Sequence, residues 1–286
     1  MRVSPILTAA AFVLPFMTAP MAQSQQKASP PLPEIRQLLR EAHEHQKQLE
    51  KVRENYTFSA SYVVQEIDGK GQVTKTETHD SEIFYVHGQP IGRLVKKDGK
   101  PLTEEEQKKE TERVTKAVEK AEKPEPDKPK DDQGVSLRRI LEAADVRNPR
   151  RENFRGRSTI VFDFVGQKDL KAHGINEDLS KKLQGTVWID EADRQVARLE
   201  VTLDDNFHVA GGLVANIQKG SRFTFDQAPV NGEIWFPTGT EVSVQMRVLL
   251  VKGIHQHITE RVYDYKRFHV ETLQGKDAKA VVETKP

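Results

Sequence analysis

The chain lacks cysteine altogether and has only two tryptophans among its 286 residues. Without cysteine it can form no disulfide and has no thiol nucleophile, so its fold must rest on the burial of apolar side chains. Neither sign of charge dominates, because 44 Lys and Arg residues stand against 43 Asp and Glu residues. Such a balance provides no field to attract nucleic acid, and we expect no nucleic-acid partner.

Long apolar runs are also missing, except near the beginning. Residues 6–16 are mostly apolar behind one positive charge at Arg2, and small residues follow as far as Ser24. This pattern is typical of a secretory signal peptide, and the run is too short to span a bilayer. The sequence predicts a signal peptide over 1–24, a disordered Gln-, Ser- and Pro-rich leader over 25–33, and no transmembrane segment after cleavage. Export without disulfides favours the bacterial periplasm.

Motifs for catalysis and cofactor binding are absent as well. There is no Gly-x-Ser-x-Gly and no phosphate-binding glycine loop, and the sequence indicates no catalytic residue and no cofactor.

Two His-x-His pairs are candidates for a metal-binding site. His43 and His45 fall on different faces of a helix, whereas His255 and His257 share one face of a strand. A third ligand such as His208 or His269 would complete a site; the alternative, which we favour, is a polar strand face. We assign no metal site.

Two periodicities organise what is present. Residues 34–54 carry apolar side chains at spacings of three and four, which predicts an amphipathic helix that must cover an apolar surface. From Tyr56 onward residues alternate instead, and the clearest example is the predicted hairpin of strands 183–190 and 196–203. We also expect a short helix from Ser136 that ends at Asn148-Pro149, and a strand over 154–165.

The segment 98–134 differs in kind, since it is dense in charge of both signs and ends in Pro-rich sequence. Thr103 and Glu106 have the spacing of a capping box, which predicts a helix start. The segment is either a lid or partner-binding arm, or simply a solvated insertion, which is the interpretation we favour.

The apolar face of the predicted sheet has two possible uses. Helices can cover the whole face and form an ordinary core with it. Alternatively, the sheet can curl and leave part of the face open as an apolar concavity for an acyl chain or peptide. The residues expected to line such a concavity are Trp188, Leu199, Phe225, Trp235 and Met246.

Several stretches resemble a known family. Gly185-Thr-Val-Trp-Ile-Asp190 followed by Val196-Ala-Arg-Leu-Glu200, then Trp235-Phe-Pro237 and Tyr263-Asp-Tyr-Lys-Arg-Phe268, are similar to the periplasmic lipoprotein-carrier (LolA/LolB-like) fold. The resemblance covers residues 34–97 and 136–272, and the insertion lies outside the family core. It implies a mainly β (α+β) protein, a curved antiparallel half-barrel sheet with helices packed on its concave face. The acyl-binding residues of the carriers do not map onto this chain, and none is transferred.

The expectation is therefore one half-barrel domain over 34–272 with an insertion at 98–134, followed by a polar tail over 273–286. The leading hypothesis is an exported, non-enzymatic protein that binds a lipid or acylated polypeptide, with a role in lipid or lipoprotein trafficking of the envelope. A second hypothesis is an envelope sensor or assembly factor that acts by protein–protein contact. A third is a metal-dependent enzyme around His255 and His257.

Overall fold

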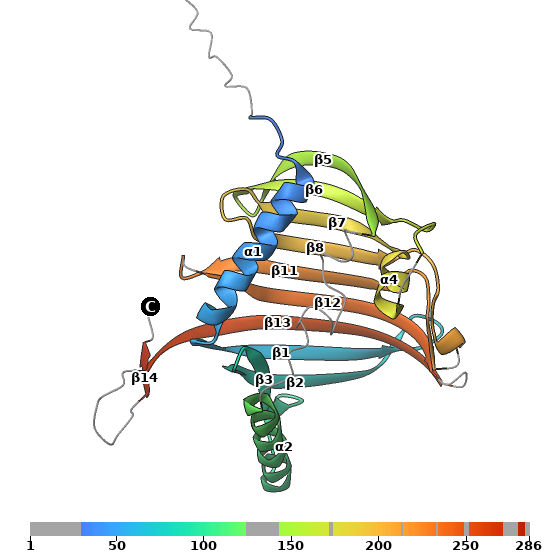
Figure 1. Cartoon of the computed structure of the whole chain (residues 1–286). Coiled ribbons are helices and arrows are strands. Elements are labelled where there is room, and N and C mark those ends of the chain that lie inside the picture. Colours follow the sequence, from blue (N-terminus) through green and yellow to red (C-terminus); the bar gives the residue numbers. More distant parts are fainter. Residues whose placement is uncertain are drawn as a thin grey trace, which may run out of the picture. The chain divides into compact units, whose positions relative to one another are not determined.

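Fourteen strands of the described residues form one antiparallel sheet in the computed structural model (Figure 1). The structure describes residues 30–123, 143–171, 174–212, 214–232, 234–248, 252–270 and 280–283. The helices are α1 (Ile35–Arg53), α2 (Glu104–Glu122), α4 (Ile175–Ser180) and the 3-10 turn η2 (Ala210–Gly212). The strands are β1 (Tyr56–Ile67), β2 (Val73–Val86), β3 (Gln89–Lys97), β4 (Lys100–Pro101), β5 (Ala144–Phe154), β6 (Arg157–Gly166), β7 (Leu183–Asp190), β8 (Val196–Leu203), β9 (Phe207–Val209), β10 (Ala215–Ile217), β11 (Arg222–Val230), β12 (Ile234–Val248), β13 (Lys252–Val270) and β14 (Ala280–Glu283).

The strand order along the sheet is β4-β3-β2-β1-β13-β12-β11-β8-β7-β6-β5, with β9, β10 and β14 paired to the side of this path. Most neighbours are consecutive in the chain, as expected for hairpins. The exceptions are the join of β1 to β13 and the join of β8 to β11. Within the described residues β4 and β5 do not pair, so the sheet remains open.

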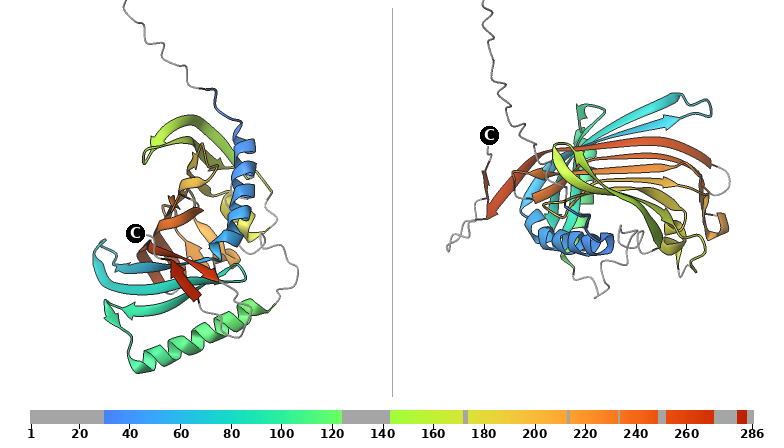
Figure 2. Two further views of the ribbon diagram at one scale, coloured as in Figure 1. Left: turned by 90° about the vertical axis from the view of Figure 1, so that its left-hand side faces the viewer. Right: turned by 90° about the horizontal axis from the view of Figure 1, so that it is seen from above.

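The sheet is curved, and α1 lies on its concave side (Figure 2). Irregular pairing accounts for part of this curvature, because a bulge bends a strand and increases its twist. Bulges interrupt β1 between Thr57 and Ser59, where Asp264 on the partner strand has a φ of 57°, and β11 between Asp226 and Gln227.

Two clusters of buried apolar side chains pack beneath α1. The first belongs to β5–β8 and includes Phe162, Phe164 and Val187, with Leu38 of α1 inserted at 1% exposure. The second belongs to β1, β2, β12 and β13 and includes Tyr56, Phe58 and Phe236, with Val52 of α1 packed against it. The helix therefore joins the two halves of the sheet through its apolar stripe.

The predicted fold class is confirmed: the protein is mainly β, with a large open antiparallel sheet and few helices. The amphipathic helix expected over 34–54 is α1, and the hairpin expected at 183–203 is β7–β8. The capping box is present too, since the Thr103 hydroxyl accepts from the Glu106 amide and the Glu106 carboxylate accepts from the Thr103 amide.

One expectation about β5 is wrong. Asn148-Pro149 does not end a helix but lies inside β5, which begins at Ala144. The register of β5 against β6 shifts between Arg147 and Arg150, and Asn148 has a φ of 50°, so a bulge accommodates the proline that a regular ladder would exclude. The strand predicted over 154–165 is correspondingly β6, with Phe154 closing β5 instead.

Other expectations lie outside the described residues: the signal peptide 1–24, most of the leader, the end of the insertion, the start of the helix at Ser136, and most of the tail. Of the helices that are described, none combines the length and apolarity needed to cross a membrane.

Candidate functional site

A continuous apolar row crosses the concave face perpendicular to the strands. Each member pairs directly with the next, so neighbouring side chains lie about 5 Å apart across the sheet. From β5 to β1 the row consists of Val146, Phe164, Gly185, Val201, Phe223, Val242, Ile258 and Val64.

Gly185 leaves space in the middle of this row. A Cβ at this position would lie 1.9 Å from the backbone oxygen of Glu200 and 2.9 Å from the ring of Phe164. The absence of a side chain therefore allows the Phe164 ring to pack flat over β7, where it is 1% exposed.

Helix α1 covers only one part of the row. At the β5–β8 end Phe164 and Val201 are buried, and Leu38 packs against them, with Ile35 and Leu39 of α1 partly buried beside it. Toward β12, β13 and β1 the row becomes half-buried at Phe223, Val242, Ile258 and Val64. Met246 and its partner Ile254 extend this half-buried apolar surface along β12 and β13.

Polar contacts hold α1 in this position. Glu41 forms an ion pair with Arg194 at 3.2 Å, and His45 Nδ1 lies 3.2 Å from the Asp193 carbonyl oxygen, both in the β7–β8 turn. At the other end Arg53 Nη2 donates to the Trp235 carbonyl oxygen at 3.1 Å. These polar contacts connect the two ends of α1 to the rim of the sheet. The apolar side chains of α1 pack between them, against the two core clusters.

The next row on the same face changes from apolar to polar. Phe162, Val187 and Leu199 continue to Phe225, but the row then runs through Thr240, Glu260, Tyr62 and His79. The Tyr62 hydroxyl donates to the Glu260 carboxylate; burial raises the pKa of Tyr62, and this hydrogen bond raises it further. Burial likewise raises the pKa of Tyr265, whose hydroxyl donates to the Pro237 carbonyl oxygen.

The structure brings three of the five expected lining residues to the concave face. Leu199 and Phe225 pair with each other in the second row, and Met246 lies farther along β12. Leu199 is buried, whereas Phe225 and Met246 are half-buried.

The two tryptophans lie elsewhere. Trp188 alternates with the buried Val187 and Ile189, so it points to the convex face, where its ring lies 6.1 Å from that of Phe154. Trp235 is 5% exposed; its indole donates to Asp193 Oδ2 at 3.0 Å, and Arg157 lies 5.5 Å from its ring centroid.

The polar group around Glu260 was not among the expected site residues. A signal for it exists in β13, where Glu260 occupies the same alternating face as Ile258 and Val262. An acidic residue at an apolar-face position is the kind of local exception that accompanies functional sites.

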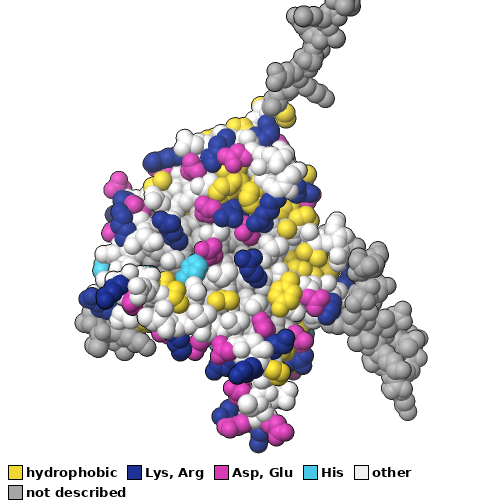
Figure 3. Space-filling model, turned by 180° about the vertical axis from the view of Figure 1, so that it is seen from behind, with side chains coloured by type: hydrophobic (Ala, Val, Ile, Leu, Met, Phe, Trp, Pro, Cys, Tyr) yellow, Lys and Arg dark blue, Asp and Glu magenta, His cyan; other side chains and the backbone are white. Residues whose placement is uncertain are grey.

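On the convex face, apolar side chains form separate groups among charges of both signs (Figure 3). A polar hollow of about 320 Å³ lies between β8, β11, β12 and β13, and Arg155, Arg198, Glu260 and Arg261 are among its lining residues. Two of these arginines are already engaged, because Arg155 and Arg198 both pair with Asp226, at 3.2 and 3.1 Å. The positive charge of these two arginines is therefore partly balanced by Asp226, which lines the same hollow.

The histidines of β13 also lie on this convex face. His257 Nε2 lies 3.5 Å from Glu241 Oε1, and His255 Nδ1 lies 3.3 Å from Gln245 Nε2. Across the described residues, no group of three His, Cys, Asp or Glu side chains has the geometry to hold a metal ion.

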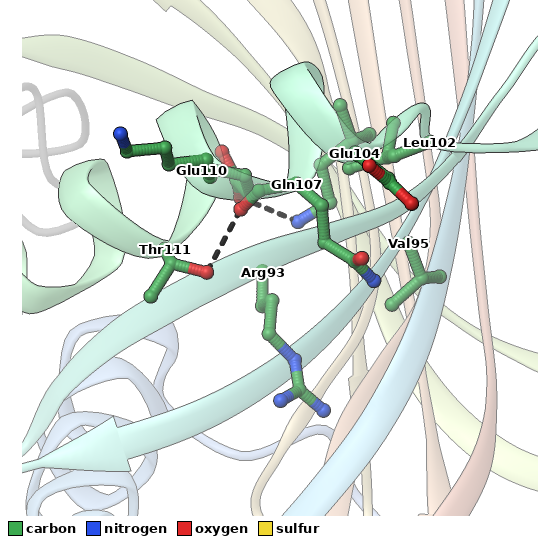
Figure 4. Close-up of a pocket in the computed structure, with 9 residues that line it drawn as sticks. Arg93, Val95, Leu102, Glu104, Gln107, Glu110 and Thr111 are labelled. Atoms are coloured by element: carbon green, nitrogen blue, oxygen red, sulfur yellow. Dashed lines mark hydrogen bonds between the residues drawn. The ribbon is translucent and has the colours of Figure 1, made fainter.

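The helix of the insertion, α2, docks against β3 through polar contacts. Glu110 accepts from the Leu94 amide at 2.6 Å, and Arg113 donates to the Gly92 carbonyl oxygen. A hollow of about 580 Å³ lies between them, and Figure 4 shows Arg93 and Gln107 at its wall. The first turns of this helix are solvated on their outer side, while Ala121 near its end is 5% exposed.

The fold and this face define a class of structure: an open, curved antiparallel sheet whose apolar concave face is partly covered by one helix. No protein-family model matches the sequence, and no curated protein matches it. Among solved structures, the chain is similar to a putative outer membrane lipoprotein-sorting protein domain from Vibrio parahaemolyticus, with 10% identity, a TM-score of 0.35, and coverage of 80% of this chain and 93% of that one.

Two further solved structures are similar at 10–11% identity. A DUF1329 family protein from Desulfovibrio piger has 11% identity and a TM-score of 0.34, covering 82% of this chain and 92% of that one. MucB of Pseudomonas aeruginosa, solved with MucA, has 10% identity and a TM-score of 0.24, covering 77% of this chain and 93% of that one.

Proposed function

We propose that the protein is an exported, non-enzymatic binding protein that holds the acyl chain of a lipid or acylated polypeptide against its concave face. The observation that carries this proposal is the apolar row, which is buried beneath α1 at one end and half-buried from Phe223 to Val64 at the other. An ordinary core would be covered along its whole length. Here four adjacent strands, spanning about 14 Å at the usual strand spacing, present apolar side chains beyond the main contacts of the helix.

Acyl burial supplies the affinity in this proposal. Each buried CH₂ contributes about 0.8 kcal/mol, so about twelve of them contribute roughly 10 kcal/mol before the loss of translational and rotational freedom is subtracted. At the lower end of that loss, about 4 kcal/mol, roughly 6 kcal/mol remains, which corresponds to binding at about tens of micromolar. Helix α1 would shield the apolar row when no ligand is present, and its rim contacts through Glu41, His45 and Arg53 would set how readily it moves.

The test uses two neighbouring residues of β12 that point to opposite faces. Met246→Glu places a charge on the concave face, and Gln245→Glu places the same charge on the convex face. In a titration with a fluorescent fatty acid, we expect Met246→Glu to weaken binding about tenfold or more and Gln245→Glu to leave it within about twofold. If the purified wild-type protein carries no lipid by mass spectrometry and shows no saturable binding, the proposal fails.

A second candidate function, an envelope sensor or assembly factor, is favoured by a different observation. On the convex face Phe154, Trp188 and Arg198 form a half-buried group of aromatic and arginine side chains, the residue types enriched at protein interfaces. Its test is removal of residues 98–134, which should abolish cross-linking to a protein partner in the envelope while leaving acyl binding unchanged. Equal partner cross-linking with and without the segment would contradict this role for it.

A further inference from the structure

Glu260 is a carboxylate on the otherwise apolar stretch of the concave face. Along β13 it lies between Ile258, a member of the apolar row, and the buried Val262. Across the sheet it pairs with Thr240 on β12 and with Tyr62 on β1. It is half-buried and therefore sits at the boundary where the concave face changes from apolar to polar.

Glu260 also lines the polar hollow bordered by Arg155, Arg198 and Arg261, but it pairs with none of these three arginines. Its interaction partner is the Tyr62 hydroxyl, and it forms no ion pair in the part of the chain that the structure describes. Arg261, the next residue, points to the opposite face. Lys97 lies in the same row but three strands farther out, about 14 Å away at the usual strand spacing.

Arg53 of α1 already has partners, because its Nη2 donates to the Trp235 carbonyl oxygen and approaches the Gln227 side chain. Burial raises the pKa of Tyr85 and of Tyr265, and the charge of Arg53 opposes this effect at both phenols. Among the described residues, the Glu260 carboxylate is thus hydrogen-bonded to the Tyr62 hydroxyl and forms no ion pair.

The surroundings of the Glu260 carboxylate favour a ligand whose polar end carries a positive charge. A half-buried carboxylate repels a second anion and strengthens its interaction with a cation as water is excluded. A ligand whose chain lies across Val242 and Ile258 and then turns along β13 would bring its polar end two residues further, beside Glu260.

We propose that Glu260 and Tyr62 form a headgroup subsite that recognises the ammonium group of an amine-bearing lipid. This inference rests on the proposed acyl-binding function and adds to it the charge class of the ligand. The acyl chain would occupy the half-buried apolar row, and the ammonium group would pair with the Glu260 carboxylate, held in place by the Tyr62 hydroxyl.

The experiment compares three probes that share a dodecyl chain: dodecylammonium, dodecanol and dodecanoate. Each displaces a fluorescent acyl probe from the full-length protein at concentrations below micelle formation. We expect the wild type to bind dodecylammonium about tenfold or more tightly than dodecanoate, with dodecanol in between. In Glu260→Gln the difference between the charged probes should fall to about twofold, while the affinity for dodecanol stays unchanged.

Two matched variants separate charge recognition from a structural effect. Glu241→Gln removes the same charge from the convex face of the neighbouring strand and should behave as wild type. Tyr62→Phe removes the hydrogen bond but keeps the carboxylate, and it should retain the preference for the cation. If Tyr62→Phe loses that preference as fully as Glu260→Gln does, the recognition of charge by Glu260 is contradicted.

The charge series on the wild type is decisive even if a variant does not fold. Equal binding of all three probes overturns the headgroup subsite while leaving acyl binding in place. A preference for dodecanoate overturns it as well. If none of the probes binds, the proposed acyl-binding function itself fails.

Discussion

Arg157 and Asp190 form a two-pronged ion pair at the end of the β6–β7 ladder. Arg157 Nε donates to Asp190 Oδ2 at 2.5 Å and Nη2 donates to Oδ1 at 2.9 Å, and the Asp190 side chain is only 1% exposed. Asp190 Oδ1 also accepts from the amides of Ala192 and Asp193, so it closes the turn to β8. One carboxylate therefore holds both the ladder and the turn that contacts α1.

This pair predicts a loss of stability in acid. Burial alone would raise the pKa of Asp190, but the hydrogen bonds from Arg157 and from the two turn amides outweigh it and lower the pKa. A carboxyl with a depressed folded-state pKa stabilises the fold above its unfolded pKa of about 4, and this stability disappears as the pH falls through the folded value. Urea midpoints measured from pH 7 down to pH 2 should therefore fall steeply below about pH 4.

Asp190→Asn tests that assignment. At pH 7 we expect the variant to lose about 2 kcal/mol of unfolding free energy, because a charged hydrogen-bonding network is replaced by a weaker one. Its stability should also depend less on pH below about pH 4 than that of the wild type. The exposed Asp169 provides the control, since Asp169→Asn should match the wild type in both measurements. An Asp190→Asn protein with the full acid dependence would contradict the argument.

Local patterns explain why parts of this structure were predictable. Helix α1 and the β7–β8 hairpin follow from the periodicity of neighbouring residues, and the Thr103 capping box follows from a four-residue motif. Strand order was not predictable, because the joins of β1 to β13 and β8 to β11 depend on contacts distant in sequence. The prediction at Asn148 failed for a related reason: a bulge in β5 tolerates a proline that was interpreted as the end of a helix.

In the candidate site, too, local patterns were predictable and long-range contacts were not. The alternation in β8 and β12 correctly indicates an apolar face for Leu199 and Met246, but the face taken by Trp188 depends on which neighbours the fold buries. Val187 and Ile189 are both buried, and this leaves Trp188 on the convex side. The surroundings of Glu260 depend on the pairing of three strands, β1, β12 and β13, so only its placement at an apolar-face position of β13 was visible in the sequence.

Gly185 provides a second prediction. Gly185→Ala should lower the free energy of unfolding by about 2–3 kcal/mol, because its Cβ would collide with the Glu200 carbonyl and displace the Phe164 ring. Gly69 is the matched control: a Cβ there meets nothing within 4 Å, so Gly69→Ala should change stability by less than about 0.5 kcal/mol. Chemical denaturation of both variants measures the difference. Equal stabilities would show that β7 and β8 are not packed this closely.

The docking of α2 gives a third prediction. Glu110 accepts from the Leu94 amide and pairs with Arg113, which lowers the pKa of its carboxyl. Glu110→Ala removes both bonds and should increase hydrogen exchange throughout α2 and at Leu94 without affecting β5–β8. Glu112→Ala, on the same helix and exposed, should leave the exchange pattern unchanged. If the Glu110 variant retains full protection of the Leu94 amide, the helix is held by other contacts.

The fourth prediction concerns α1 as a cover for the concave face. Leu38 is 1% exposed and packs into the first core cluster, so Leu38→Ala should destabilise the protein by about 2–4 kcal/mol. If the helix shields the apolar row, its loosening should also raise the rate at which a fluorescent acyl probe binds, measured by stopped flow at a temperature where the variant is fully folded. Glu44→Ala, on the exposed side of α1, should change neither stability nor rate. An unchanged rate in Leu38→Ala, together with the expected loss of stability, would mean that α1 is a fixed part of the core and that ligands reach the row from the half-buried side at β12, β13 and β1.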